Sequence, residues 1–279
     1  YYEQLDNSSP RRAFFAGDPA SNNFGDPVGT GDAILNDANL TASLDQTAFF
    51  LELSYDITDA MELTVGSRRY DYKRTSLFLS QGLFGTNLDD GGDDNDADET
   101  GSNHKVNLKY EISDDSIVYA QWAEGFRPGN TNVLPPADIC DVDNNLILDG
   151  TDVPFSNSFD ADTLESYEFG LKSTLLDKRL TVNATVYRNN WNDIPISVQS
   201  PTCGFSLVGN AATAQTQGFE IETVFSVTDS LLLSFGSSYV DAELTSDADN
   251  LGGKSGDRLP GSPDYSANAG VQYDFELTG

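Results

Sequence analysis

Two long strands joined by a tight polar turn are predicted within residues 164–194. The first strand alternates side chains of two kinds, with Tyr167, Phe169, Leu171 and Leu175 on one face and Ser166, Glu168, Lys172 and Thr174 on the other. The second strand repeats this alternation, with Leu180, Val182, Ala184 and Val186 against Thr181, Asn183, Thr185 and Asn189. A period of two is the signature of a sheet. Long strands with one apolar and one strongly polar face are typical of a membrane-spanning β-barrel.

Composition narrows the classes of protein that remain. The chain of 279 residues carries 45 Asp and Glu against 15 Lys and Arg, a formal charge of −30. This charge repels nucleic-acid phosphates, so we expect no nucleic-acid partner. No apolar run approaches the roughly 20 residues that a transmembrane helix needs. A β-barrel remains possible because only alternate residues of its strands face lipid.

Unequal connections support the barrel over a soluble β-sandwich. Alternation predicts about nine strands, at residues 47–57, 61–79, 105–112, 116–126, 164–175, 180–198, 217–227, 231–244 and 265–277. Tight turns are predicted at residues 58–60, 113–115, 176–179 and 228–230. Long polar loops are predicted at residues 80–104, 127–163 and 245–264, and a shorter one at 199–216. Outer-membrane barrels have short periplasmic turns and long extracellular loops. A sandwich also alternates, but it rarely combines such long strands with such unequal loops.

Residues 87–102 form the most acidic stretch of the chain, with aspartates among glycines and asparagines. Such a run cannot bury apolar surface, so it is predicted to be a solvated, mobile loop. The alternative is a rim at a pore mouth that attracts cations.

A second acidic pattern resembles the oxygen-ligand spacing of a calcium loop. Asp141, Asp143, Asn145 and Asp149, with Asp152 further on, approximate ligand positions of such a loop. Leu146 stands where a calcium loop needs glycine for its sharp turn. The pattern therefore leaves open a structural calcium site or a plain acidic loop, and no other cofactor is predicted.

The two cysteines, Cys140 and Cys203, both lie in predicted loops. A disulfide between neighbouring loops suits an oxidising compartment, and two unrelated thiols are the alternative. No secretory signal opens the chain at Tyr1, so we expect that it was removed or that the chain is an internal piece.

Catalysis finds little support in the sequence. The only histidine, His104, lies beside the acidic stretch, and a loop or strand-start position explains it. No phosphate-binding glycine loop opens a helix, and no thiol pair has metal-ligand spacing. We therefore expect that the protein is not an enzyme.

Four ordered segments resemble TonB-dependent outer-membrane receptors. They are residues 118–130 (VYAQWAEGFRPGN), the hairpin 164–193, residues 209–222 (GNAATAQTQGFEIE) and residues 259–265 (LPGSPDY). With the flanking strands, the resemblance covers residues 49–277. It implies a 22-stranded barrel with an N-terminal plug in the outer membrane of a Gram-negative bacterium. It also implies import of a scarce nutrient, such as a ferric siderophore, with energy from the inner-membrane TonB complex.

The chain departs from the complete family pattern. No plug and no energy-coupling box are recognised, so residues 1–279 are expected to form a single domain, a segment of the barrel of about nine to ten strands. A passive porin or a structural surface protein is the alternative function. The turn at residues 125–130 offers Arg127 and Asn130 as ligand-contact candidates, although Pro128 and Gly129 are also explained as turn residues.

Overall fold

One antiparallel sheet dominates the computed structural model, which describes residues 2–14, 34–81, 93–248 and 253–275. Its ten strands lie in the order β1-β2-β3-β4-β5-β8-β9-β10-β11-β12, so each long strand pairs with the next long strand along the chain. The strands are β1 (Tyr2–Phe14), β2 (Ile34–Thr58), β3 (Met61–Gln81), β4 (Asp93–Ser113), β5 (Ser116–Arg127), β8 (Asp162–Leu175), β9 (Leu180–Gln199), β10 (Ser206–Thr228), β11 (Leu231–Leu244) and β12 (Tyr265–Tyr273). The all-β, antiparallel fold expected from the sequence is confirmed.

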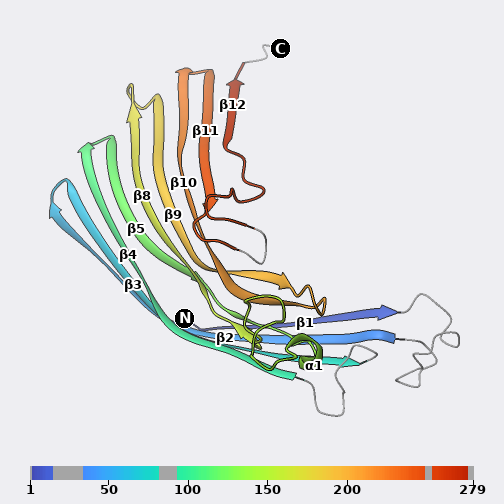
Figure 1. Ribbon diagram of the computed structural model, residues 1–279. Helices are drawn as coiled ribbons and strands as arrows, with labels where there is room; N and C mark the ends of the chain where they lie inside the picture. Colours follow the sequence, from blue (N-terminus) through green and yellow to red (C-terminus); the bar gives the residue numbers. More distant parts are fainter. Residues whose placement is uncertain (1, 15–33, 82–92, 249–252, 276–279) are drawn as a thin grey trace.

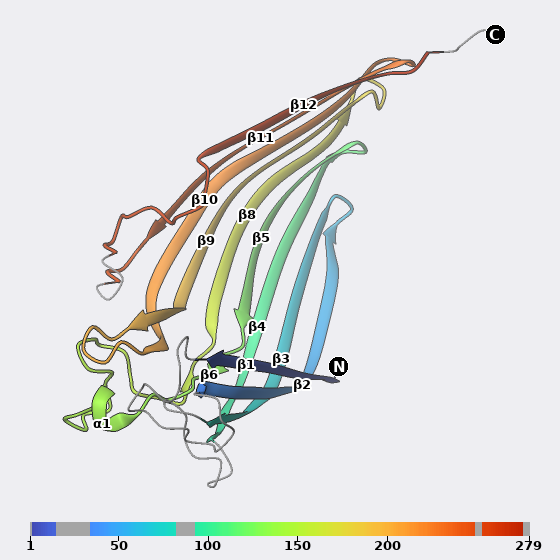
Figure 2. The same cartoon turned by 90° about the vertical axis from the view of Figure 1, so that its right-hand side faces the viewer.

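The two ends of the sheet differ (Figures 1 and 2). Short turns connect β2 to β3, β4 to β5, β8 to β9 and β10 to β11 at one end, which we call the turn end. The long connections lie at the opposite end, the loop end. There residues 128–161 form β6 (Asn130–Thr131), α1 (Ala137–Cys140) and β7 (Ser158–Phe159). No helix among the described residues is long and apolar enough to cross a membrane.

The strand register places the apolar side chains of neighbouring strands on one face. Phe169 of β8 lies beside Ala120 of β5 and Val186 of β9, and Val186 lies beside Phe219 of β10. A shift of one residue would move every side chain to the other face, so the pattern fixes the register. Phe169, Val186 and Phe219 are exposed. This outer face has no protein layer over it in the described residues, as expected for strands that meet lipid.

The other face of the sheet, which we call the inner face, carries mostly polar side chains. Lys105 forms an ion pair with Glu52 over a distance of 2.5 Å. Tyr119 of β5 covers Gly170 of β8, where a Cβ atom would collide with the phenol ring, and its hydroxyl donates to the Glu168 carboxylate. The absence of a side chain at Gly170 therefore creates the space that the ring fills.

The prediction of a mobile loop at residues 87–102 is wrong from Asp93 onward. Residues 87–92 lie outside the described residues, but β4 begins at Asp93 and pairs with β3 from Phe78↔Asp93 to Met61↔Tyr110. The β3 backbone satisfies the hydrogen bonds of this segment, and Lys73 forms an ion pair of 3.2 Å with Asp96. A strand that extends beyond the membrane need not be apolar, so composition alone gave the wrong prediction.

Other predicted boundaries also change. The predicted loop at 199–216 is shorter, because β10 begins at Ser206 and pairs with β9. Bulges at Asn210/Ala212 and Ala212/Ala214 interrupt the alternation there, and this hid the strand in the sequence. Strand β1 and the first part of β2 were not predicted, whereas the hairpin of β8 and β9 is confirmed.

Candidate functional site

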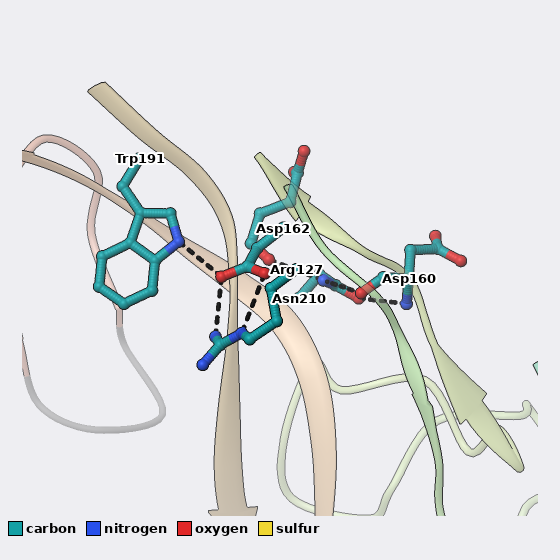
Figure 3. Close-up of polar contacts among 6 residues, drawn as sticks. Arg127, Asp160, Asp162, Trp191 and Asn210 are labelled. Carbon is teal, nitrogen blue, oxygen red and sulfur yellow. Dashed lines mark hydrogen bonds and ion pairs between the residues drawn. The ribbon is translucent and has the colours of Figure 1, made fainter. Parts of the chain in front are cut away.

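An ion pair joins the two ends of the long connection 128–161 (Figure 3). Arg127 is the last residue of β5 and Asp162 is the first of β8, and the sheet register places them side by side. The Arg127 guanidinium donates to both Asp162 carboxylate oxygens, from Nε over 3.1 Å and from Nη2 over 2.7 Å. Trp191 of β9 donates from Nε1 to the same carboxylate over 2.6 Å, and its ring lies 5.7 Å from the Arg127 Cζ atom.

The exposure of this cluster is one-sided. The Asp162 side chain is 3% exposed, whereas the Arg127 side chain is 60% exposed. Three donors compensate the buried carboxylate, and a bidentate geometry fixes the guanidinium plane. The remaining N–H groups of Arg127 have no hydrogen-bond partner among the described residues, and the side chain is exposed.

An aromatic stack holds the start of the same connection against β3. The Phe126 ring lies 3.6 Å from the Tyr70 ring, with the planes 7° apart. The Tyr72 hydroxyl accepts a hydrogen bond from the Gly129 N–H over 2.8 Å and donates to the Glu99 carboxylate over 2.9 Å. A Cβ atom at position 129 would collide with the Phe159 carbonyl, so glycine is required there.

Two asparagines join the connection to β10 through their side-chain amides. Asn132 donates to the Val208 carbonyl over 2.8 Å and accepts from the Val208 N–H over 3.1 Å. Asn210 does the same with the backbone of Asp160, over 2.9 and 2.8 Å (Figure 3). Each side-chain amide thus makes the pair of hydrogen bonds that a backbone residue of a neighbouring strand would make. Residues 128–161 are therefore fixed at both ends.

A small apolar core and a disulfide lie in the middle of this connection. Cys140 and Cys203 are disulfide-bonded, with Cα atoms 5.4 Å apart, and the bond joins α1 to the short loop between β9 and β10. The buried residues around it are Cys140, Leu148, Val153, Val198 and Leu207. The long connection is therefore a packed unit that stands on β9 and β10.

The acidic pattern of the same connection forms one cluster. Ligand atoms of Asp141, Asp143 and Asp149 all lie within 4.8 Å of one another. Leu146 has a φ of 62°, so the backbone makes the left-handed turn for which calcium loops use glycine. The Asn145 amide N–H donates to the Asp141 carboxylate over 2.9 Å. This all-oxygen donor set fits a hard cation, and calcium binding stays a prediction.

The connection between β11 and β12 is held by a carboxylate. Asp247 accepts from the Ser255 backbone N–H over 2.9 Å and pairs with the Lys254 ammonium over 3.3 Å. The Ser255 hydrogen bond, followed by Lys254, lowers the pKa of Asp247 below its ordinary value. Asp247 therefore stays charged when other carboxyl groups begin to protonate.

Of the predicted ligand-contact candidates, Arg127 is exposed at the loop end and Asn130 lies in β6, where its side chain accepts from the Thr131 N–H. His104 lies within β4, and its backbone N–H donates to Glu124. Sequence reasoning missed Asp162 and Trp191. Asp162 lies just outside the alternating pattern of the hairpin, and only the register with Arg127 reveals its partner.

Comparisons with known proteins define the class. The family model of the TonB dependent receptor-like β-barrel matches residues 2–279, and the chain belongs to this family. Its members are outer-membrane β-barrels, as the sequence predicted. The pesticin receptor of Yersinia enterocolitica is 24% identical over 224 residues, which are 80% of this chain and 29% of that receptor.

Solved structures show the same fold. The ferric yersiniabactin uptake receptor FyuA from Yersinia pestis has a TM-score of 0.69 at 20% identity, covering 88% of this chain and 33% of that one. The ferric citrate transporter FecA has a TM-score of 0.61 at 18% identity, covering 98% of this chain and 36% of that one. The chain thus spans 29–36% of the length of these three proteins. These names are those of receptors and transporters, which fits the expectation of a non-enzyme.

Proposed function

We propose that this chain is the barrel segment of a receptor that imports a ferric siderophore or a similar iron complex. The family match over residues 2–279 carries the proposal. Two of the matched proteins are named for ferric yersiniabactin and ferric citrate, both iron complexes. The energy source that we infer is the TonB complex of the inner membrane, which would act through parts of the receptor outside this chain.

The loop end supplies a site for such a ligand. Arg127 projects N–H donors at the base of a rigid connection, and Asp162 and Trp191 fix its guanidinium. Iron chelates built from carboxylates or phenolates carry negative charge, and a fixed guanidinium is suited to planar oxygen anions. Arg127 is therefore a ligand-contact residue in this proposal, and Asp162 is a positioning residue.

The test is uptake of radioactive iron by iron-starved cells of the source bacterium. We expect deletion of the parent gene to abolish uptake of one iron chelate from a supplied panel, and the full-length gene to restore it. Loss of TonB should abolish the same uptake. Uptake that continues without TonB would instead support a passive porin, and normal iron uptake in the deletion strain would contradict the proposal.

Arg127→Gln in the full-length receptor tests the site itself. We expect the apparent KM of uptake to rise about tenfold or more, because a charge-assisted hydrogen bond contributes about 1.5–3 kcal/mol. Arg188→Gln is the matched control, since Arg188 is exposed and, among the described residues, its side chain donates only to Asn190. Equal changes in the two variants would exclude Arg127 from the binding site.

A further inference from the structure

Strand β3 presents a row of aromatic and charged side chains on the inner face at the loop end. Alternate residues share a face, so Arg68, Tyr70, Tyr72, Arg74 and Ser76 form this row. Arg74 occupies its fourth position. Leu44 of β2 and Ala97 of β4 flank it in register, and neither carries a charge. No acidic side chain therefore stands directly beside Arg74 in the sheet.

Residues 126–132, which we call the strap, run along this row. Phe126 stacks on Tyr70, and the Gly129 N–H donates to the Tyr72 hydroxyl. The Thr131 and Ser76 hydroxyl oxygens lie 2.6 Å apart, in hydrogen-bond contact. Gly129 and Thr131 thus fasten the strap on either side of Arg74. Arg74 lies between these two attachment points on the same face of β3.

Arg74 has no partner among the residues that the structure describes. Its Nε atom is buried and makes no hydrogen bond. Asp96 and Asp98 of the neighbouring strand lie on the opposite face in register. Glu99 lies on the same face as Arg74 but is already engaged, because it accepts from the Tyr72 hydroxyl and from the Ala161 N–H. The other arginines with described side chains all have polar partners: Arg68, Arg69, Arg127, Arg179, Arg188 and Arg258.

An unpaired donor in this position is unfavourable. Leaving a buried polar atom without a hydrogen bond costs about 1–3 kcal/mol, and more for a charged group. The chain carries a formal charge of −30, so anions to pair with are abundant. Arg74 nevertheless remains without one, at the end of the barrel where a ligand would enter. Buried polar groups in folded proteins are nearly always hydrogen-bonded, so an unsatisfied one calls for a specific explanation.

We propose that Arg74 binds an oxygen anion of the transported ligand, such as a carboxylate or phenolate of an iron chelate. The inference rests on the proposed function, and it adds a second anion-binding residue to Arg127. The planar guanidinium fork binds such oxygens through two parallel hydrogen bonds. Tyr72 and Ser76, whose hydroxyl groups hold the strap, are the neighbours of Arg74 on the same face of β3. An anionic ligand group would enter between the strap and β3.

Citrate binding to the purified full-length receptor tests the proposal. Citrate is a defined probe with three carboxylates, and sodium chloride at equal ionic strength controls for screening. By calorimetry we expect saturable citrate binding to the wild type and at least tenfold weaker binding to Arg74→Gln. Arg69→Gln is the matched control, because Arg69 lies on the same strand, is exposed on the opposite face and should leave citrate affinity unchanged.

Arg74→Lys keeps the test decisive if the glutamine variant does not fold. It retains the charge but loses the fork, so citrate affinity should fall several-fold. Unchanged citrate affinity in either variant, or no citrate binding by the wild type, would overturn the proposal. A lower thermal stability of ligand-free Arg74→Gln with unchanged citrate affinity would show that a carboxylate elsewhere in the receptor pairs with Arg74. Iron uptake is measured separately, so failure here leaves the transport proposal standing.

Discussion

Single residues of the inner face show how close packing limits substitution. Tyr119 lies directly over Gly170, so the phenol ring occupies the volume of the absent side chain. The ring is held from two further sides, because its hydroxyl donates to Glu168 and the Lys172 ammonium lies 5.5 Å from its centre. A ring fixed in this way cannot move aside at low cost.

Gly170→Val is therefore expected to destabilise the receptor by about 1–3 kcal/mol, as overpacking does in a filled site. Gly125→Val is the matched control, because a Cβ atom at Gly125 meets no heavy atom within 4 Å. Both glycines lie in paired strands, which makes the backbone effects comparable. Urea unfolding of the full-length receptor in detergent measures the free energy of unfolding of both variants. Equal decreases would mean that the Tyr119 ring moves aside without cost, which would contradict the prediction.

Asp162→Asn removes the charge that three donors share. We expect the free energy of unfolding to fall by about 1.5–3 kcal/mol, which is the usual contribution of a hydrogen bond to a charged group. Amide hydrogen exchange should accelerate at residues 127–131 and 158–163. In the control Asp160→Asn, the backbone contacts of residue 160 with Asn210 remain, so exchange should not change. Equal exchange in both variants would contradict a positioning role of Asp162.

At the scale of elements, residues 128–161 behave as a built part of the protein and not as a loose loop. Asn132 and Asn210 replace strand neighbours, and the disulfide closes a sequence separation of 63 residues. In the chain-entropy model, closing a loop of this length stabilises by about 4 kcal/mol. The apolar side chains around Cys140 add a local core.

Cys140→Ser with Cys203→Ser is expected to loosen this unit alone. Limited proteolysis should cut within residues 137–153 in the double variant but not in the wild type, while the barrel strands stay intact. Cys203→Ser alone should behave as the double variant does, because one thiol cannot form the bond. A protease-resistant double variant would mean that the small core and the asparagine contacts suffice.

Sequence patterns predicted some elements better than others, for physical reasons. The β8–β9 hairpin was predicted because lipid requires alternation there. The loop-end half of β4 was not, because Asp93, Asp96 and Asp98 lie beyond the apolar part of the sheet, where alternation carries no constraint. For the candidate site, Arg127 was singled out from its turn. The contacts of Asp162 and Asn210 depend on strand register and on β-bulges, and no local sequence pattern encodes either.

At the scale of the whole molecule, the assignment of the two faces decides how the sheet meets its surroundings. The apolar face is exposed from β2 to β12, with Leu53 and Val271 both largely open. The polar face carries ion pairs such as Lys105–Glu52. A water-soluble sandwich would bury the apolar face against a second sheet, and the described residues form only one large sheet.

Phe169→Arg tests this assignment in the full-length receptor. An arginine on the lipid face near the bilayer centre costs about 2–4 kcal/mol. Asn183→Arg is the matched control, because Asn183 lies on the inner face beside Lys172 and Glu222 in register. Unfolding by guanidinium chloride, with the receptor folded into lipid vesicles, measures the free energy of unfolding of both variants. We expect a large loss for Phe169→Arg and a change within about 1 kcal/mol for Asn183→Arg, where water and a carboxylate solvate the charge. The reverse order would place the polar face toward lipid and would exclude the barrel orientation derived from the register.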